Sequence, residues 1–134
     1  MLRYVILLHE LSSGHELARG GATHWDLMLE WGTVLRTWAV ACEPAVGLTC
    51  DAEQLADHRL AYLEYEGPVS GNRGHVTRWD AGQYEIESQA DHALALVLHG
   101  PRLPCRLSLS KGDAKKGDIT HFWSVSLGAA PIRG

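Results

Sequence analysis

The sequence lacks the excess of basic residues that a broad nucleic-acid-binding surface normally requires. Its 134 residues include 16 Asp and Glu against 12 Lys and Arg, which gives a formal net charge of −4 at pH 7. This balance argues against a protein that coats nucleic acid. It leaves room for a small anion pocket, because a few local arginines can dominate the potential of a cleft.

Cysteine is also scarce, and the three cysteines are widely spaced. Cys42, Cys50 and Cys105 form no CxxC pair, so the sequence predicts reduced thiols rather than a disulfide framework or a zinc knot. The first residues have no signal-peptide layout, and no apolar run is long enough to span a bilayer. We therefore expect a cytoplasmic protein with no membrane partner.

Helical patterns are scarce as well, and short apolar or alternating runs separated by turn residues dominate the chain. The runs cover residues 3–9, 24–30, 33–41, 61–66, 75–80, 83–87, 93–98, 104–110 and 121–127. Such regularly spaced short strands predict an antiparallel sandwich or barrel. Residues 29–35 and 79–84 are expected to form hairpins, and residues 51–56 one short turn of helix or a loop.

No internal repeat, low-complexity tract or linker divides the chain. Its length is sufficient for one domain with a substantial core. We expect a single domain over residues 1–127 and a flexible tail over residues 128–134.

The alternating run THWDLMLE, residues 23–30, carries most of the candidate chemistry. Successive side chains of a strand point to opposite faces, so His24 and Asp26 project from the same face, about 7 Å apart. Such a pair can bind a divalent metal or hold a reacting proton, or it can be purely structural and satisfied by hydrogen bonds. An apolar run upstream ends in His9. If the two strands pair, two histidines and an aspartate converge on one ion.

Two other segments contain residue types that bind phosphate. In the first, His58 precedes Tyr62 by four positions, and an imidazolium and a phenol can each donate to a phosphate oxygen. In the second, two glycines flank Arg73, which predicts a tight loop with exposed amides and a guanidinium suited to an anion. Taken singly, each segment fits a structural role better than a functional one, as a strand entrance or a hairpin turn.

In this order, the segments resemble the 3′-phosphoesterase domain of bacterial DNA ligase D and its stand-alone relatives. That family has a first-strand histidine followed by patterns of the types HYDLRLE, SWAVPKG, EDHPLxYxxFEG and VxxWDxG. The corresponding segments here are His9, HWDLMLE, TWAV, ADHRLAYLEYEG and VTRWDAG. The resemblance covers roughly residues 3 to 127, and five motifs in one order form a specific signal.

The resemblance implies an all-β fold, a compact antiparallel β-barrel with little helix. It also implies a role in DNA repair, in which a manganese-preferring site removes a 3′ phosphate or a terminal ribonucleoside. Carried over position by position, His9, His24 and Asp26 match the metal ligands, while His58 and Tyr62 match catalytic residues that engage the scissile phosphate. The expected cofactor is therefore Mn²⁺, with Zn²⁺ or Co²⁺ as alternatives. The expected partners are DNA or RNA–DNA 3′ ends and a repair ligase or polymerase.

The sequence departs from the family pattern at three places. Met28 stands where the family has a phosphate-contacting arginine, and the segment ACE replaces PKG, so a lysine is also missing. Because His9 lies so near the first residue, we expect no counterpart of the family's N-terminal arm. Either Arg73 or Arg36 binds the phosphate in place of the missing arginine, giving an altered phosphoesterase, or the chain keeps the metal cage and has lost or changed the reaction.

Two other functions stay open at this point. The barrel of a former enzyme can serve as a non-catalytic module that binds DNA ends or a partner protein. Two histidines and one carboxylate are also the ligand set of a non-haem iron centre, as in a cupin-like oxygenase whose third ligand would be His75 or His99. This last function leaves the segments DHRLAY and WDAG unexplained.

Overall fold

The computed structural model describes residues 1–11, 23–71, 73–112 and 122–131, most of which lie in β-strands. The strands are β1 (Leu2–Glu10), β2 (Thr23–Trp31), β3 (Val34–Val40), β4 (Thr49–Arg59), β5 (Gly67–Pro68), β6 (His75–Ala90), β7 (Ala93–Leu98), β8 (Cys105–Lys111) and β9 (Phe122–Ala129). Within these ranges the only helix is the short 3₁₀ helix η1 (Leu60–Leu63). The prediction of an all-β protein with little helix is confirmed.

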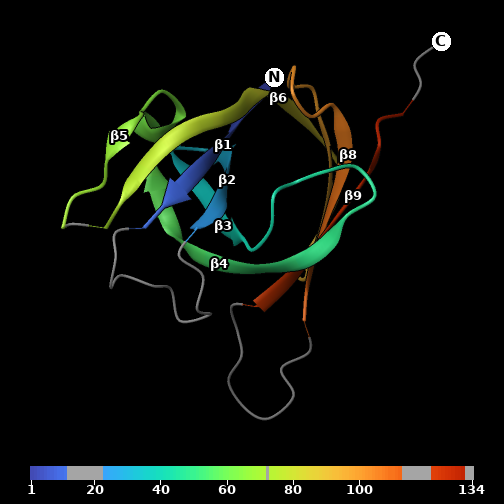
Figure 1. Ribbon diagram of the computed structural model, residues 1–134. Helices are drawn as coiled ribbons and strands as arrows, with labels where there is room; N and C mark the ends of the chain where they lie inside the picture. The colour runs from blue at the N-terminus through green and yellow to red at the C-terminus, as the bar shows by residue number, and fades with distance from the viewer. Residues whose placement is uncertain (12–22, 72, 113–121, 132–134) are drawn as a thin grey trace.

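Antiparallel pairing closes the sheet into a barrel (Figure 1). The strands follow the order β1-β2-β3-β4-β9-β8-β7-β6, and β6 pairs back with β1 to complete the ring. The long strand β6 pairs with β1 through its first half and with β7 through its second half. The two-residue strand β5 pairs with the start of β6 and lies at the side of the ring. The predicted antiparallel barrel is therefore confirmed.

Strands β1 to β3 carry apolar clusters on both faces. The larger cluster, which includes Tyr4, Leu27 and Trp38, fills the barrel interior. The smaller one, called here the outer cluster, consists of Val5, Leu7, Met28, Leu35, Leu63 and Val76. Leu63 comes from η1, which covers this face of the sheet. Strands buried on both faces are apolar almost throughout. The candidate ligands His9, His24 and Asp26 lie on the outer face, next to the outer cluster.

Residues 51–56, expected to form a helical turn or a loop, are instead part of β4. This strand pairs with β3 on one side and with β9 on the other. Ala52 is its only buried residue, so its side chains show no apolar alternation. Backbone pairing with two neighbours determines this strand, and a pattern of side chains could not reveal it.

Residues 61–66 do not form the expected strand, because η1 and the turn after it occupy this segment. The apolar residues that suggested a strand are used differently. Leu63 is buried in the outer cluster, and Leu60 and Tyr62 pack against that cluster. A short helix can place such residues on one side as effectively as a strand does.

Residues 79–84 do not form the expected hairpin, because they lie inside β6. Gly82, which suggested a turn, is required for a different reason: a Cβ at this position would lie 2.9 Å from the Cα atom of Gly100. Glycine in a strand often marks such a close approach of backbones. The hairpin predicted over residues 29–35 is confirmed, with Gly32 at φ 65° between β2 and β3.

Strand β9 continues to Ala129, so the first two residues of the expected tail belong to the sheet. Residues 132–134 of that tail lie outside the described residues. In the part of the chain that the structure describes, no helix has both the length and the apolar character needed to cross a membrane.

Candidate metal centre

The pairing of β1 with β2 places His9 directly opposite His24. Asp26 lies two residues beyond His24 on the same face of β2, and one donor atom from each of the three side chains lies within 4.8 Å of the others. An ion bound at about 2.0–2.2 Å brings its donor atoms to within roughly 4.4 Å of one another. The three side chains are therefore almost in position to share one ion, as the sequence predicts.

The buried polar atoms of this group are only partly satisfied by the described residues. His24 and Asp26 are each 3% exposed. His24 Nε2 lies 2.9 Å from Asp26 Oδ1, yet neither atom is in a hydrogen bond, and His24 Nδ1 also has no partner. Buried polar atoms without partners are rare and destabilising. A cation coordinated by an imidazole nitrogen and a carboxylate oxygen would satisfy them, so this donor set fits a divalent metal.

His9 links this group to the loop between β5 and β6. Its Nδ1 lies 3.0 Å from Asp26 Oδ2, and its Nε2 lies 2.8 Å from the carbonyl oxygen of Arg73. Both partners are acceptors, so both ring nitrogens can donate only when the imidazole is protonated. Its side chain is also the most exposed of the three, at 14% against 4% for the other two. The centre is therefore open on the side of His9.

The local environment shifts the pKa values of His9 and Asp26 in opposite directions. Burial lowers the pKa of His9, but its hydrogen bonds to Asp26 and to the Arg73 carbonyl outweigh burial, so that this pKa is raised. Burial raises the pKa of Asp26, but the adjacent His24 and His9 outweigh it, so that this pKa lies below its usual range. In the absence of metal, these shifts favour an imidazolium–carboxylate pair.

These shifts predict that the metal-free protein is most stable in mildly acidic solution. Asp26 contributes stability that is present above its unfolded pKa of 3.8 and lost as the pH falls through the folded value. His9 contributes stability that is present below its unfolded pKa of 6.5 and lost as the pH rises through the folded value. In EDTA, the urea midpoint should be higher at about pH 5.5 than at about pH 8.5.

The matched control for this pH dependence is His9→Gln, which keeps a polar side chain but cannot titrate. The difference between the two midpoints should be smaller in this variant than in the wild-type protein. An equal difference in both proteins would show that His9 does not contribute to the pH dependence.

The carbonyl of Arg73 reaches His9 because Gly74 allows the loop to lie against the end of β1. Gly74 has φ 94°, and a Cβ here would lie 2.1 Å from the carbonyl oxygen of Glu10. The Arg73 guanidinium is held within its own loop. Its Nε donates to the carbonyl oxygen of Ser70 at 2.7 Å, and its Nη2 donates to the Ser70 hydroxyl at 3.1 Å. Arg73 thus contacts the centre through its backbone, and its predicted role as a phosphate ligand stays a prediction.

Gly74→Ala is expected to lower the free energy of unfolding by about 1–3 kcal/mol, because it adds backbone strain and a steric clash. Urea denaturation measures this change. Gly128→Ala is the matched control: an added Cβ there meets no atom within 4 Å, so its effect should stay within about 0.5 kcal/mol. Equal stabilities of the two variants would contradict the close approach at Gly74.

Arg36 is not brought to the centre. It pairs with Leu29, whereas Asp26 pairs with Ala39, so the Arg36 side chain lies on the interior face of the sheet. Its guanidinium carbon lies 4.7 Å from the ring centroid of Trp31 and 5.0 Å from that of Trp38. The structure therefore does not support Arg36 as a phosphate ligand at this centre. The alternation of the strand already indicated this, because Arg36 and Trp38 share one face.

His58 and Tyr62 lie together, on the same outer face but away from the three candidate ligands. Their ring centroids are 5.4 Å apart, edge to face. His58 pairs with Leu35, which is four residues along β3 from Ala39, the partner of Asp26. Four residues of strand span roughly 13 Å. A substrate of nucleotide size, rather than a lone phosphate group, is needed to contact both places.

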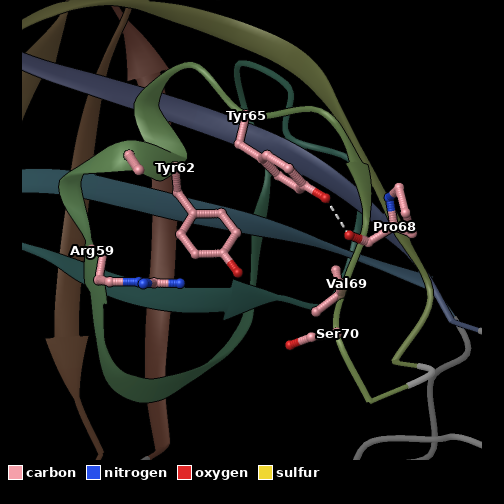
Figure 2. A pocket seen from close by; sticks show the side chains of 7 residues that line it. Arg59, Tyr62, Tyr65, Pro68, Val69 and Ser70 are labelled. Carbon is pink, nitrogen blue, oxygen red and sulfur yellow. Dashed lines mark hydrogen bonds between the residues drawn. The ribbon is translucent and has the colours of Figure 1, made fainter.

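A pocket of about 320 Å³ lies beside η1, and sequence analysis did not predict it. Its lining residues are Arg59, Ala61, Tyr62, Tyr65, Pro68, Val69 and Ser70 (Figure 2). The available signal lay in the motif ADHRLAYLEYEG. Arg59 stands where the pattern EDHPLxYxxFEG has proline, and Tyr65 stands where it has phenylalanine.

The alternative ligands of a cupin-like centre do not join the group. His99 Nε2 lies 2.5 Å from Glu85 Oε2. His75 pairs along the sheet with Glu10 and Pro68. Among the described residues, the set of side chains able to share an ion contains neither of these histidines. The geometry thus favours His9 as the third ligand.

Comparison with known families adds a second, independent observation. A sequence model of the DNA Ligase D 3′-phosphoesterase domain matches residues 14–111. The chain belongs to this family. The match includes His24, Asp26, His58 and Tyr62 but begins after His9, so the place of His9 in the centre rests on the pairing of β1 with β2. The resemblance inferred from the motifs is confirmed.

Individual relatives in the DNA ligase D family are much longer proteins. The multifunctional non-homologous end joining DNA repair protein LigD of Mycobacterium tuberculosis is 33% identical over 101 residues, which cover 67% of this chain and 13% of that protein. The multifunctional non-homologous end joining protein LigD of Pseudomonas aeruginosa is 28% identical over 127 residues, covering 86% of this chain and 14% of that protein. The chain thus corresponds to a small part of the curated relatives that it matches.

Proposed function

We propose that this protein is a metal-dependent phosphoesterase that processes the 3′ ends of nucleic acid in DNA repair. Its reaction would remove a 3′ phosphate or a terminal ribonucleoside and leave a 3′ hydroxyl for a repair polymerase or ligase. The observation that carries the proposal is the group of His9, His24 and Asp26, whose donor atoms lie within 4.8 Å of one another. Membership of the DNA Ligase D 3′-phosphoesterase domain family supports the substrate class.

The three side chains would hold one divalent ion, with Mn²⁺ as the first expectation and Zn²⁺ or Co²⁺ as alternatives. Imidazole nitrogens and carboxylate oxygens are suitable ligands for each of these ions. When bound, the metal supplies Lewis-acid polarisation of a phosphoryl oxygen. Asp26 and His24 are the deeply buried members, and His9 lies on the open side where a substrate can approach.

His58 has a ring nitrogen that is available to exchange a proton with a substrate long enough to reach it from the metal centre. Its Nδ1 lies 2.8 Å from the carbonyl oxygen of Ala56, an acceptor, so Nδ1 carries a proton. This arrangement leaves Nε2, which has no hydrogen-bond partner among the described residues, to donate when protonated or to accept when neutral. The ring of Tyr62 packs edge to face against His58 and holds its orientation.

The test uses Mn²⁺ and primer–templates that end in a ribonucleotide or in a 3′ phosphate. We expect loss of the terminal group and a product that a polymerase extends, while a 5′ phosphate on the same strand is retained. His58→Ala should lower the rate about 100- to 1,000-fold, as removal of a comparable transition-state donor does. His92→Ala, which changes an exposed histidine in the turn between β6 and β7, is the control. Failure to process either substrate with Mn²⁺, Co²⁺ or Zn²⁺ would refute the proposal.

A second candidate is a non-catalytic module that binds DNA ends, and one observation favours it. Met28 is fully buried at the position where the family pattern has a phosphate-binding arginine. This candidate predicts that a fluorescent 3′-phosphorylated primer–template binds equally well to the wild-type protein and to Asp26→Ala. Weaker binding by Asp26→Ala would favour the metal-dependent enzyme.

A further inference from the structure

The pocket beside η1 has polar groups on two facing walls. Arg59 and Tyr62 extend from the end of β4 and from η1, and Ser70 faces them from the segment that follows β5 (Figure 2). A volume of about 320 Å³ lies at the lower end of the range of small-ligand pockets, about 300–1,000 Å³. It is large enough for one nucleotide and too small for a folded partner.

Arg59 provides a positive charge that the described residues do not use. The residue is exposed and forms no hydrogen bond or ion pair with them, whereas Arg3 pairs with Glu30 and Arg106 with Glu87. A guanidinium presents a planar fork of donors that suits phosphate. Arg59 replaces the proline of the family pattern, so this chain has a cation in the pocket that the pattern lacks.

Two tyrosine rings contribute aromatic surface to the pocket, next to Ala61, Pro68 and Val69. The ring centroids of Tyr62 and Tyr65 are 5.5 Å apart with an interplanar angle of 75°. The hydroxyl of Tyr65 donates to the carbonyl oxygen of Pro68, which fixes the ring over the strand segment opposite. Tyr65 is still 36% exposed, so a base could reach its surface. Stacking on aromatic rings is how proteins commonly hold unpaired bases.

The pocket is also connected to the candidate metal centre. Ser70 accepts two hydrogen bonds from the Arg73 guanidinium, and the Arg73 carbonyl oxygen lies 2.8 Å from His9 Nε2. Hydrogen bonds of Arg73 therefore link a pocket wall to a candidate ligand. Tyr62 and Val69 pack on the outer cluster that contains Met28, on the face of the sheet that carries Asp26.

We propose that this pocket binds one unpaired nucleotide at the 3′ end of the substrate, next to the phosphate that the metal centre receives. Arg59 binds the phosphate of that nucleotide, and Tyr65, with Tyr62 beside it, packs against its base. The position of the pocket relative to the reaction rests on the proposed function, whereas nucleotide binding itself does not. Arg59, at the end of β4, thereby provides a cation for the substrate, whereas the family pattern has its arginine on β2, at the position of Met28.

The test is a titration of the full chain with adenosine 5′-monophosphate in EDTA, followed by NMR of the backbone amides. Signals of Ala61, Val69 and Ser70 should shift most. Adenosine should bind at least about tenfold more weakly than the monophosphate, because it lacks the group that Arg59 recognises. No shift at these amides up to about 10 mM, well above the dissociation constants usual for specific sites, or equal binding of the two probes, would overturn the proposal.

Two pairs of variants separate the charge from the ring. Arg59→Gln should lower the affinity for the monophosphate about tenfold, whereas Arg106→Gln, which removes an equal charge on β8, should leave it unchanged. Tyr65→Ala should lower the affinity by a similar factor, whereas Tyr65→Phe keeps the ring, loses only the hydrogen bond to Pro68, and should retain most of the affinity. Wild-type affinity in Arg59→Gln would overturn the assignment of the phosphate to Arg59.

Failure of this inference can be distinguished from failure of the proposed function. If the monophosphate shifts the pocket amides but no 3′ end is processed, the pocket stands and the phosphoesterase assignment falls. If 3′ ends are processed, Arg59→Gln should raise KM at least about fivefold with little change in kcat. The reason is that Arg59 would bind a part of the substrate that does not react. An unchanged KM would remove Arg59 from substrate binding.

Discussion

Replacing His24 with alanine is expected to abolish the stabilisation of this protein by Mn²⁺. A ligand present at 100 times its dissociation constant raises the free energy of unfolding by about 2.7 kcal/mol. Losing even a residue that hydrogen-bonds to a metal ligand weakens metal binding roughly 10- to 100-fold, and loss of a direct ligand should weaken it more. Urea denaturation with and without Mn²⁺ should therefore show a shift in the wild-type protein and none in His24→Ala.

The control for this experiment is His99→Ala, which removes the same type of side chain far from the centre. His99 is paired with Glu85 at the end of β7, so its loss should leave the Mn²⁺-dependent shift intact. A shift that persists in His24→Ala, or one that disappears in His99→Ala, would show that Mn²⁺ binds somewhere other than the candidate centre.

The metal-free comparison is informative too, because His24 is an unusual buried residue. Neither of its ring nitrogens is in a hydrogen bond with the described residues, although Nε2 lies 2.9 Å from Asp26 Oδ1. A histidine selected for stability would normally form hydrogen bonds. We therefore expect the metal-free form of His24→Ala to lose less stability than deletion of a well-satisfied buried side chain would cost. Functional centres often contain residues that are unfavourable for the stability of the fold.

The centre was the part of the protein most accessible from the sequence. Strand alternation alone puts His24 and Asp26 on one face, and a single assumption, that the two strands pair, adds His9. The same rule indicated that Arg36 shares a face with Trp38. The geometry therefore does not support Arg36 as a phosphate ligand at the centre.

Other features depended on contacts between segments far apart in the sequence. Gly82 resembles a turn signal, but it is needed because the backbone of Gly100 approaches it. Strand β4 has no apolar alternation and is determined by its two neighbours. The pocket at Arg59 requires η1 and the segment after β5 to face each other, and neither segment indicates the other from its own sequence.

Replacing Met28 with arginine, which restores the residue of the family pattern, is expected to destabilise this protein rather than activate it. Met28 is 1% exposed and lies in the outer cluster with Val5, Leu35 and Leu63. The nearby carboxylates on this face of β2, Asp26 and Glu30, already pair with His9 and Arg3. A buried guanidinium without a free partner should therefore lower the free energy of unfolding by about 3 kcal/mol or more, as measured by urea denaturation.

Met28→Leu is the matched control, because it conserves volume and apolar character and should cost less than about 1.5 kcal/mol. If Met28→Arg is as stable as the wild-type protein and processes 3′ ends faster, the outer cluster can admit a cation at position 28. Met28 would then mean only that a phosphate contact has been lost.

We expect the opposite result, and it has a consequence for the substrate. If a cation cannot return to β2 without unfolding the outer cluster, any positive charge that the substrate requires has to come from outside that cluster. Arg59 is exposed, is unpaired among the described residues, and lines a pocket on that same face.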